Sequence, residues 1–330
     1  SHIMTRSIKD PVRGGTIAHQ GRLPYYKSLE SATGANRQNG RGGACNTYYS
    51  VLDPEVLDII GLRNPTSIDE KRIPDLDYTV SYNRFFAERA AANEDWMLIS
   101  YLHAPDLWQA MYSPDKNLFS ELYYKYLNDS TVPKKIVKAR DIAFKFLKEA
   151  PQTGRAYTFD SYEANTHTPF LDKIYSSNLC TEIFVPTAPF EKGVQELYSE
   201  DSNGEIGLCN LMAIVLGRIK DDAEYAMAAY YCLLVIDEAI HSMDYPFKSL
   251  EVSAKGRMSA GVGLMNLAYD MANKGFYYSA QSGKEYMHYV AERHAYFLYE
   301  ASLKLGIERG NAPWMHKTKI PEGWLPIDTY

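Results

Sequence analysis

The chain has few cysteines, no long hydrophobic run and no excess of basic residues, and each absence excludes a class of protein. Four cysteines among 330 residues do not make a disulfide scaffold. None of them lies in a Cys-x-x-Cys pair, so a zinc site is not expected. No apolar run is long enough to cross a bilayer, and no signal peptide opens the sequence. The net charge of −6 leaves too few cations to neutralise the phosphates of a nucleic acid. We therefore expect a cytoplasmic protein (host cytoplasm if viral) with no metal, DNA or membrane bound.

An alternation of strand and helix patterns runs through the chain. With 45% hydrophobic and 23% charged residues, it can bury a core. Strands are expected at 47–51, 77–82, 96–101, 154–159, 181–185 and 260–264. Helices are expected from 53, at 83–93, 105–112, 116–128, 133–150, 221–241 and 283–305, and from the end of the strand 260–264 to 273. The apolar segment 208–216 fits either a strand or a helix. Repeated strand-then-helix units favour parallel strands in one α/β sheet or barrel, and we expect a single domain.

One short stretch, Ser177 to Ile183, carries the most suggestive chemistry. In an extended segment side chains alternate between faces, so Asn178, Cys180 and Glu182 would share one edge. An amide, a thiol and a carboxylate together suit a hydroxylated substrate. The alternative is a buried cysteine between two incidental polar groups.

A second cysteine, Cys209, lies among apolar residues in 204–211. It is either a small buried hydrophobe or, together with Cys180, one of two thiols that face one pocket and could support redox work. The opening 9–43 is rich in Gly, Arg and Asn, which is typical of mobile loops that approach a ligand closely, or of a plain surface loop. It lacks the Gly-Lys-Ser/Thr ending of a P-loop.

Two Glu-x-x-His pairs also occur on expected helices: Glu238/His241 and Glu285/His288. This spacing places a carboxylate and an imidazole on one helix face, as in di-iron bundles. The bridging acids that a bundle needs have the candidates Glu121 and Glu149, neither in apolar surroundings. Chance spacing is favoured, and a di-iron helical protein is a remote alternative.

Several motifs together resemble the large catalytic subunit of ribonucleotide reductase, in its aerobic class Ia form. They are the stretches 177–183 with 186–187, 204–211, 256–258 with 261–263, 312–314 and 325–330, and upstream Arg6 with 11–15, 41–44, 153–155 and 165–169. The resemblance covers nearly the whole chain. It implies part of a ten-stranded α/β barrel, with the radical cysteine on an internal finger loop.

The resemblance also implies roles for individual residues. Cys180 would carry a transient thiyl radical that removes the ribose 3′ hydrogen. Glu182 would act as general base on the 3′-hydroxyl, and Asn178 would hydrogen-bond the ribose hydroxyls. Cys209 would be one of two thiols that supply reducing equivalents and finish as a disulfide.

The loop 34–43 would be the specificity loop between effector and substrate. Gln38, Arg41, Gly42 and Gly43 would lie there, and Arg6 would lie at the effector nucleotide. The loop is one residue shorter than the familiar form. The resemblance further implies nucleoside triphosphate effectors, ribonucleoside diphosphate substrates, a large-subunit dimer, and thioredoxin or glutaredoxin as reductant. No cofactor would bind directly, because the radical would come from a di-iron tyrosyl small subunit.

Several parts of the reductase pattern have no counterpart in this sequence. They are the N-terminal regulatory domain, the partner of Cys209, the C-terminal barrel part with its phosphate loop and paired tyrosines, and the C-terminal cysteine pair. We interpret residues 1–3 as an expression scar before Met4. The chain would then be the central barrel piece of a split subunit, or a fragment cut for study. We expect it to be active only with the missing pieces and the small subunit; a non-catalytic structural or interaction fragment is the alternative.

Overall fold

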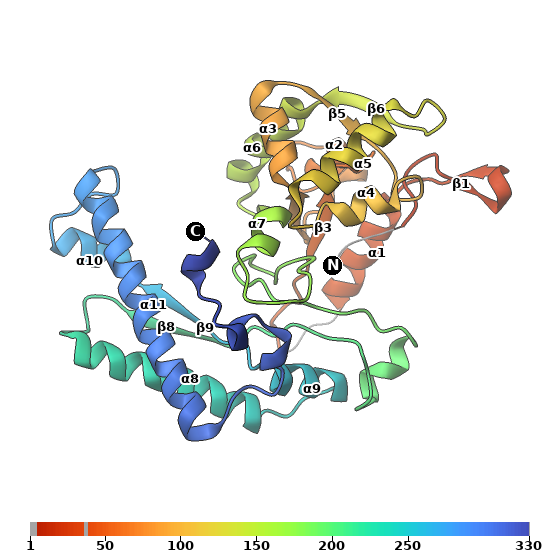
Figure 1. Cartoon of the computed structure of the whole chain (residues 1–330). Coiled ribbons are helices and arrows are strands. Elements are labelled where there is room, and N and C mark those ends of the chain that lie inside the picture. The colour runs from red at the N-terminus through yellow and green to blue at the C-terminus, as the bar shows by residue number, and fades with distance from the viewer. Residues whose placement is uncertain (1–4, 36–38, 330) are drawn as a thin grey trace. The chain divides into compact units, whose positions relative to one another are not determined.

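The computed structural model describes residues 5–35 and 39–329, and the chain divides into two compact units (Figure 1). The first unit comprises Ser1–Pro186 with Leu325–Tyr330, and the second comprises Thr187–Trp324. Each has its own cluster of buried hydrophobic side chains. The single-domain expectation stays a prediction.

A three-stranded parallel sheet forms the centre of the first unit. Its order is β3 (Asn46–Ser50), β4 (Asp77–Tyr82) and β7 (Ala156–Asp160), with Thr79 of the middle strand opposite Tyr48 and Tyr157. The middle strand is buried along nearly its whole length, as expected of a parallel sheet covered on both faces. The predicted parallel strands with crossover connections are confirmed here.

Helices and two antiparallel strand pairs complete this unit. The helices are α1 (Leu23–Ala35), α2 (Val56–Ile60), α3 (Arg84–Ala92), α4 (Pro105–Ala110), α5 (Lys116–Asn128), α6 (Ala139–Thr153) and α7 (Ser161–Thr166). The pairs are β1 (Pro11–Val12) with β2 (Ile17–Ala18), and β5 (Asp95–Leu98) with β6 (Lys135–Lys138).

Local sequence signals account for several of these boundaries. Asn83 caps α3 by accepting from the Phe86 N–H at 3.1 Å, and Asp115 caps α5 by accepting from the Asn117 N–H at 2.9 Å. Gly154 ends α6 in the left-handed conformation, with φ of 64°. The structure corrects the predicted helix at 133–150, because its first residues pair with β5 as strand β6 and the helix begins at 139.

The second unit is built on a parallel strand pair, β8 (Leu211–Val215) and β9 (Gly261–Met265). Its helices are α8 (Asp222–Ser242), α9 (Lys248–Arg257), α10 (Leu267–Asn273) and α11 (Gln281–Arg309). The Tyr225 hydroxyl of α8 hydrogen-bonds the His294 Nδ1 of α11 at 2.9 Å, and Nε2 of that ring meets the Val262 carbonyl of β9 at 2.7 Å. One histidine therefore ties both helices to the sheet.

The α/β class expected from the sequence is confirmed. Across the residues described, the strands form one three-stranded and three two-stranded sheets, and these do not close into a barrel. The ten-stranded barrel and the internal finger loop therefore stay predictions. In the same residues, no helix combines the length and the apolar character that a membrane span requires.

A buried ion pair lies in the first unit. Arg22 and Asp53 are only 2% and 0% exposed, and Nη1 of the guanidinium donates to the carboxylate. The carboxylate also accepts from the Glu55 N–H at 2.9 Å. Burial raises the pKa of Asp53 from its ordinary 3.8 to about 6, although Arg22 acts in the opposite direction.

This raised pKa predicts how the stability of the chain depends on pH. The folded state binds the Asp53 proton more tightly than the unfolded chain, so the resulting stability is complete below pH 3.8 and is lost as pH rises through about 6. Asp53→Asn cannot ionise. Relative to the unchanged chain, it should gain up to about 3 kcal/mol between pH 4 and pH 7 in urea unfolding. Asp69→Asn, at a position 94% exposed, is the control, and a pH-independent difference for Asp53→Asn would contradict the prediction.

Candidate active site

The segment that leads from α7 to the candidate site is anchored by hydrogen bonds between Asn165 and the backbone of Ile174. The Asn165 side chain donates to the Ile174 carbonyl at 2.9 Å and accepts from the Ile174 N–H at 2.8 Å. Both residues are buried. Because the two bonds act on one backbone residue, they fix where the next segment starts.

The amide of Asn178 organises the segment that follows. Its oxygen accepts from the backbone N–H groups of Glu182 and Ile183, each at 3.1 Å. Its nitrogen donates to Oε1 of Glu182 at 2.6 Å. The Thr181 N–H donates to the Asn178 carbonyl at 3.3 Å, which closes a tight turn with Leu179 and Cys180 at its exposed tip. We call residues 178–183 the Asn178 turn.

Strand β3 supports this turn from beneath. The Asn46 Nδ2 donates to the Leu179 carbonyl at 2.9 Å, and the Tyr48 hydroxyl donates to the Asn178 carbonyl at 3.1 Å. Thr79 of β4 donates to Oδ1 of Asn46 at 2.9 Å and so orients that amide. Sequence reasoning missed these supports. The available signal was an asparagine directly before the predicted strand 47–51, a residue type that is uncommon in strands.

The local conformation differs from the one predicted. Residues 181–185 form no strand, and Thr181 has a φ of 62°, so the simple alternation of faces does not hold. The reason is the Asn178 side chain, which takes the backbone N–H groups that a strand would offer to a neighbour. The turn nevertheless brings Asn178 against Glu182, the association that alternation had predicted.

The turn presents three functional groups at the surface. Cys180 and Glu182 are exposed, and Asn178 is partly exposed. A carboxylate held by an amide can accept a proton from a hydroxyl group, and an exposed thiol can exchange a hydrogen with a bound molecule. The charge of Cys180 also contributes, after burial and Asp77, to raising the pKa of the Tyr157 phenol.

Cys209 lies in the second unit, in the segment that leads into β8, and it is exposed. The structure corrects the reading of a small buried hydrophobe. The next residue, Asn210, donates to the Ser259 carbonyl at 3.0 Å and accepts from the Gly261 N–H at 2.9 Å, which fixes this segment beside β9. The expectation that Cys180 and Cys209 serve one pocket stays a prediction.

The residues assigned to effector and base recognition make fewer described hydrogen bonds than the Asn178 turn. Gln38 lies outside the described residues, while Arg41, Gly42 and Gly43 are exposed just before β3. Arg6 donates to the Pro11 carbonyl at 3.2 Å. Within the described residues of the first unit, no hydrogen bond or ion pair joins Arg6 or Arg41 to the Asn178 turn.

Three of the four residues in the two Glu-x-x-His pairs interact with other groups. Glu238 forms an ion pair with Arg309, and Nδ1 of His241 lies 2.8 Å from the Asp237 carbonyl. Glu285 accepts from Gln281 at 3.1 Å on its own helix. Where side chains are described, no group of three or more His, Cys, Asp or Glu residues is placed to hold a metal ion.

Exposure predicts which thiols react first. Cys180 and Cys209 are exposed, whereas Cys232 is buried in α8 and its burial raises the pKa of the thiol. In the folded chain, iodoacetamide should label Cys180 and Cys209 at least about tenfold faster than Cys232, because a buried thiol reacts only after local opening. Peptide mass spectrometry over time gives the rates, and denatured chain is the control. Equal rates in the folded state would contradict the prediction.

Comparison with known proteins gives a consistent result. Residues 2–330 match the family described as "Ribonucleotide reductase, barrel domain". The chain is 34% identical over 329 residues to the ribonucleoside-diphosphate reductase subunit alpha of Haemophilus influenzae, covering 98% of this chain and 43% of that protein. It is 35% identical to the ribonucleoside-diphosphate reductase 1 subunit alpha of Escherichia coli, covering 98% of this chain and 42% of that protein. It is 32% identical to the ribonucleoside-diphosphate reductase subunit alpha of Enterobacteria phage T4, covering 99% of this chain and 43% of that protein. The chain thus spans less than half the length of these relatives. It belongs to the ribonucleotide reductase barrel-domain family.

Proposed function

We propose that the chain supplies the catalytic-core segment of a class Ia-type ribonucleoside-diphosphate reductase, which converts ribonucleoside diphosphates to 2′-deoxyribonucleoside diphosphates. The observation that carries this proposal is the Asn178 turn, where a carboxylate, an amide and a thiol are held within five residues. The family membership and the names of the relatives support the reaction class.

Each group has a role that its setting supports. Cys180, as a thiyl radical, takes a hydrogen atom from the ribose 3′ carbon and later returns one. Glu182 accepts the 3′-hydroxyl proton, and its bond to the Asn178 amide orients it for this task. Asn178 also faces the ribose hydroxyls. Cys209 and a second thiol supply two electrons and finish as a disulfide.

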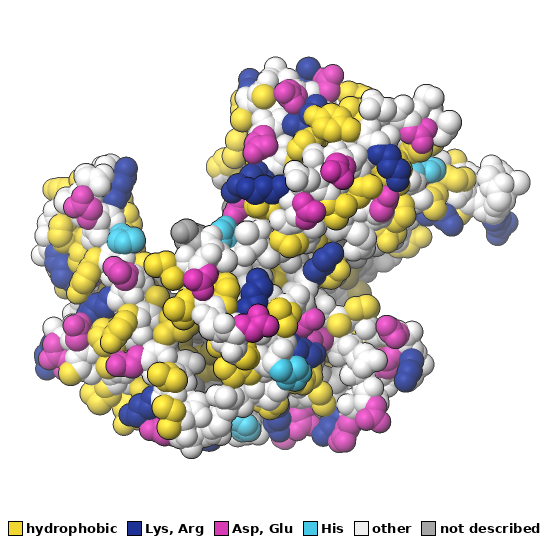
Figure 2. Space-filling view, in the orientation of Figure 1, with side chains coloured by type: hydrophobic (Ala, Val, Ile, Leu, Met, Phe, Trp, Pro, Cys, Tyr) yellow, Lys and Arg dark blue, Asp and Glu magenta, His cyan; other side chains and the backbone are white. Residues whose placement is uncertain are grey.

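The proposal also requires the remaining part of the large subunit to bind this chain. Exposed apolar surfaces of the second unit support such an interface. Parallel strands are normally covered on both faces, yet Leu211 of β8 and Met265 of β9 are 52% and 54% exposed. Leu303 and Ile307 of α11 are 68% and 78% exposed. Figure 2 shows hydrophobic side chains at the surface over α8 and α11. Apolar surface of this kind marks an interface. We infer that the other part of the subunit covers it, and that the chain alone does not reduce nucleotides.

Effectors and partners follow from the same proposal. A di-iron tyrosyl small subunit would supply the radical, and thioredoxin or glutaredoxin would reduce the disulfide. Arg6 would contact a nucleoside triphosphate effector at a large-subunit dimer. Gln38, Arg41, Gly42 and Gly43 would read the base, with Arg41 available because it is exposed.

Reconstitution tests the proposal. The chain is mixed with polypeptides covering the remaining length of its relatives, the small subunit and a reductant, and dCDP formed from CDP is measured. We expect turnover only with every component present. Turnover by this chain with the small subunit alone would refute the need for other pieces, whereas an inactive but assembled mixture would favour a non-catalytic structural fragment.

A further inference from the structure

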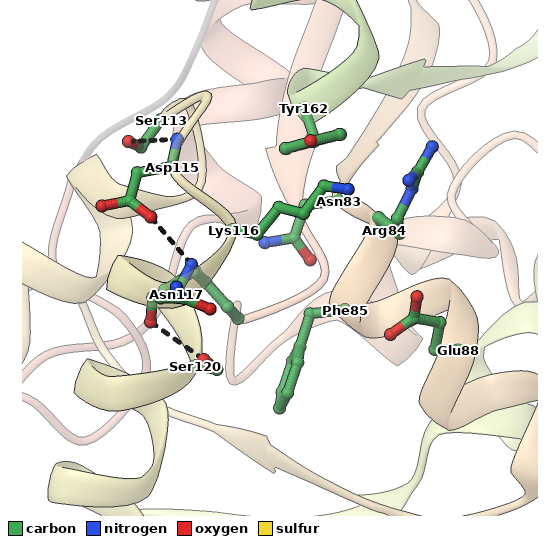
Figure 3. A pocket seen from close by; sticks show the side chains of 11 residues that line it. Asn83, Arg84, Phe85, Glu88, Ser113, Asp115, Lys116, Asn117, Ser120 and Tyr162 are labelled. Carbon is green, nitrogen blue, oxygen red and sulfur yellow. Dashed lines mark hydrogen bonds between the residues drawn. The ribbon is translucent and has the colours of Figure 1, made fainter. Parts of the chain in front are cut away.

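A cavity separate from the Asn178 turn opens in the first unit where two helices begin. It has a volume of about 260 Å³ and lies between the N-terminal ends of α3 and α5, with Tyr162 of α7 at its side (Figure 3). The residues that matter below are Asn83 and Arg84 of α3, Lys116 of α5, and Tyr162. We call this cavity the Arg84/Lys116 pocket.

Two cations meet over one aromatic ring in this pocket. The Arg84 guanidinium carbon lies 5.1 Å from the centroid of the Tyr162 ring, and Nζ of Lys116 lies 5.8 Å from it. Arg84 is partly neutralised by an ion pair with Glu163 at 2.5 Å. Lys116 forms no ion pair with any residue that the structure describes. The pocket therefore holds positive charge that its own walls do not fully balance.

Two largely buried residues present hydrogen-bond donors to the same cavity. Asn83 and Tyr162 are 5% and 8% exposed. The Asn83 oxygen is used to cap α3, but its NH₂ group and the Tyr162 hydroxyl have no hydrogen-bond partner among the described residues. Donor groups of largely buried residues normally find a partner in the protein, in water or in a ligand. Because both line the cavity, their acceptor would be a molecule inside it.

The N-terminal ends of two helices add to the positive electrostatic potential of the pocket. Helices α3 and α5 have nine and 13 residues, and both begin at the pocket, so their partial positive charges lie there. Two acids, Glu88 and Asp115, also line it. Asp115 is engaged as the cap of α5. The acids would repel a ligand that spreads several negative charges over the whole cavity.

We propose that the Arg84/Lys116 pocket binds a single phosphate-type oxyanion group. Lys116 and Arg84 supply charge, and the Asn83 amide and the Tyr162 hydroxyl donate hydrogen bonds. The volume of about 260 Å³ also leaves room for a small organic group attached to the phosphate. The site uses none of the residues assigned to nucleotide reduction, so the proposal stands independently of the proposed function.

Binding of inorganic phosphate to the full chain tests this directly, by calorimetry at constant ionic strength. We expect saturable binding of one phosphate per chain. Lys116→Gln should weaken it about tenfold or more, because a hydrogen bond to a charged group is lost, and Tyr162→Phe about three- to tenfold. Sulfate should compete, and chloride at equal ionic strength should not.

Lys148→Gln, at an exposed position of α6, makes the same change in net charge and should leave phosphate binding unchanged. Lys116 is also exposed, so its replacement should not affect folding, which circular dichroism checks. Tyr162→Phe keeps the ring that packs beneath both cations. Non-saturable binding, equal weakening by Lys148→Gln, or full affinity in Tyr162→Phe would each overturn the proposal.

Discussion

Replacing Cys180 by alanine is expected to lower CDP reduction by the reconstituted reductase by at least about 10⁴-fold, to the background of the assay. The reason is that every later step in the proposed mechanism depends on hydrogen abstraction by this sulfur. None of the hydrogen bonds that hold the Asn178 turn uses the Cys180 side chain. The variant should therefore fold and assemble normally.

Matched variants separate chemistry from structure in this test. Cys180→Ser keeps the size and polarity of the side chain but cannot form a thiyl radical, so it should be equally inactive. Glu182→Gln should retain some turnover, lower by about 10²- to 10⁴-fold, because a general base contributes that much. Measurable reduction of CDP by an assembled Cys180→Ala enzyme would rule out the proposed role.

The second large effect is on stability. Arg22→Ala should lower the free energy of unfolding by about 3–5 kcal/mol near neutral pH, because it leaves the buried Asp53 carboxylate without its partner. The guanidinium also lies 5.6 Å from the centroid of the Trp108 ring, so some packing is lost as well. Urea unfolding at pH 7.5 measures the change.

An exposed ion pair gives the control for this prediction. Arg72 pairs with Asp69 at 3.3 Å, but Asp69 is 94% exposed, so Arg72→Ala should cost less than about 1 kcal/mol. The double variant Arg22→Met/Asp53→Asn removes both charges and should recover much of the stability. A cost for Arg22→Ala as small as that for Arg72→Ala would contradict the assigned role of the buried pair.

The strong periodic patterns in the sequence were sufficient for much of the fold. Strands β3, β4 and β9 and helices α3, α5, α8 and α11 lie close to their predicted ranges. Alternation of elements also predicted the parallel pairing. These features depend on side-chain periodicity and on capping residues such as Asn83 and Asp115, which act locally and are readable from sequence.

The errors share a different cause. Strand β6 exists because β5 is available to pair with it, which no local pattern shows. Helix α1 was missed because its polar, glycine-containing sequence resembles a loop, although Tyr26 is fully buried. Helix α9 was missed for a similar reason, since it is rich in serine and charge.

The candidate site also has one part that the sequence predicts and one part that it does not. The identities of Asn178, Cys180 and Glu182 were readable because their residue types suggest chemistry. The turn that joins Asn178 to Glu182 was not, because it depends on contacts with Asn46 and Tyr48, which lie 133 and 130 positions before their partners. Contacts at such sequence separation leave no periodic signal.

The way the Asn178 turn is held has a practical consequence for spectroscopy. Its shape depends on backbone carbonyls, backbone N–H groups and the side chains of Asn46, Tyr48 and Asn178. The side chain at position 180 projects from this frame without supporting it. Position 180 is therefore suited to an isotopic, selenium or fluorine label, whose signal would report on the surroundings of the turn while its backbone stays unchanged.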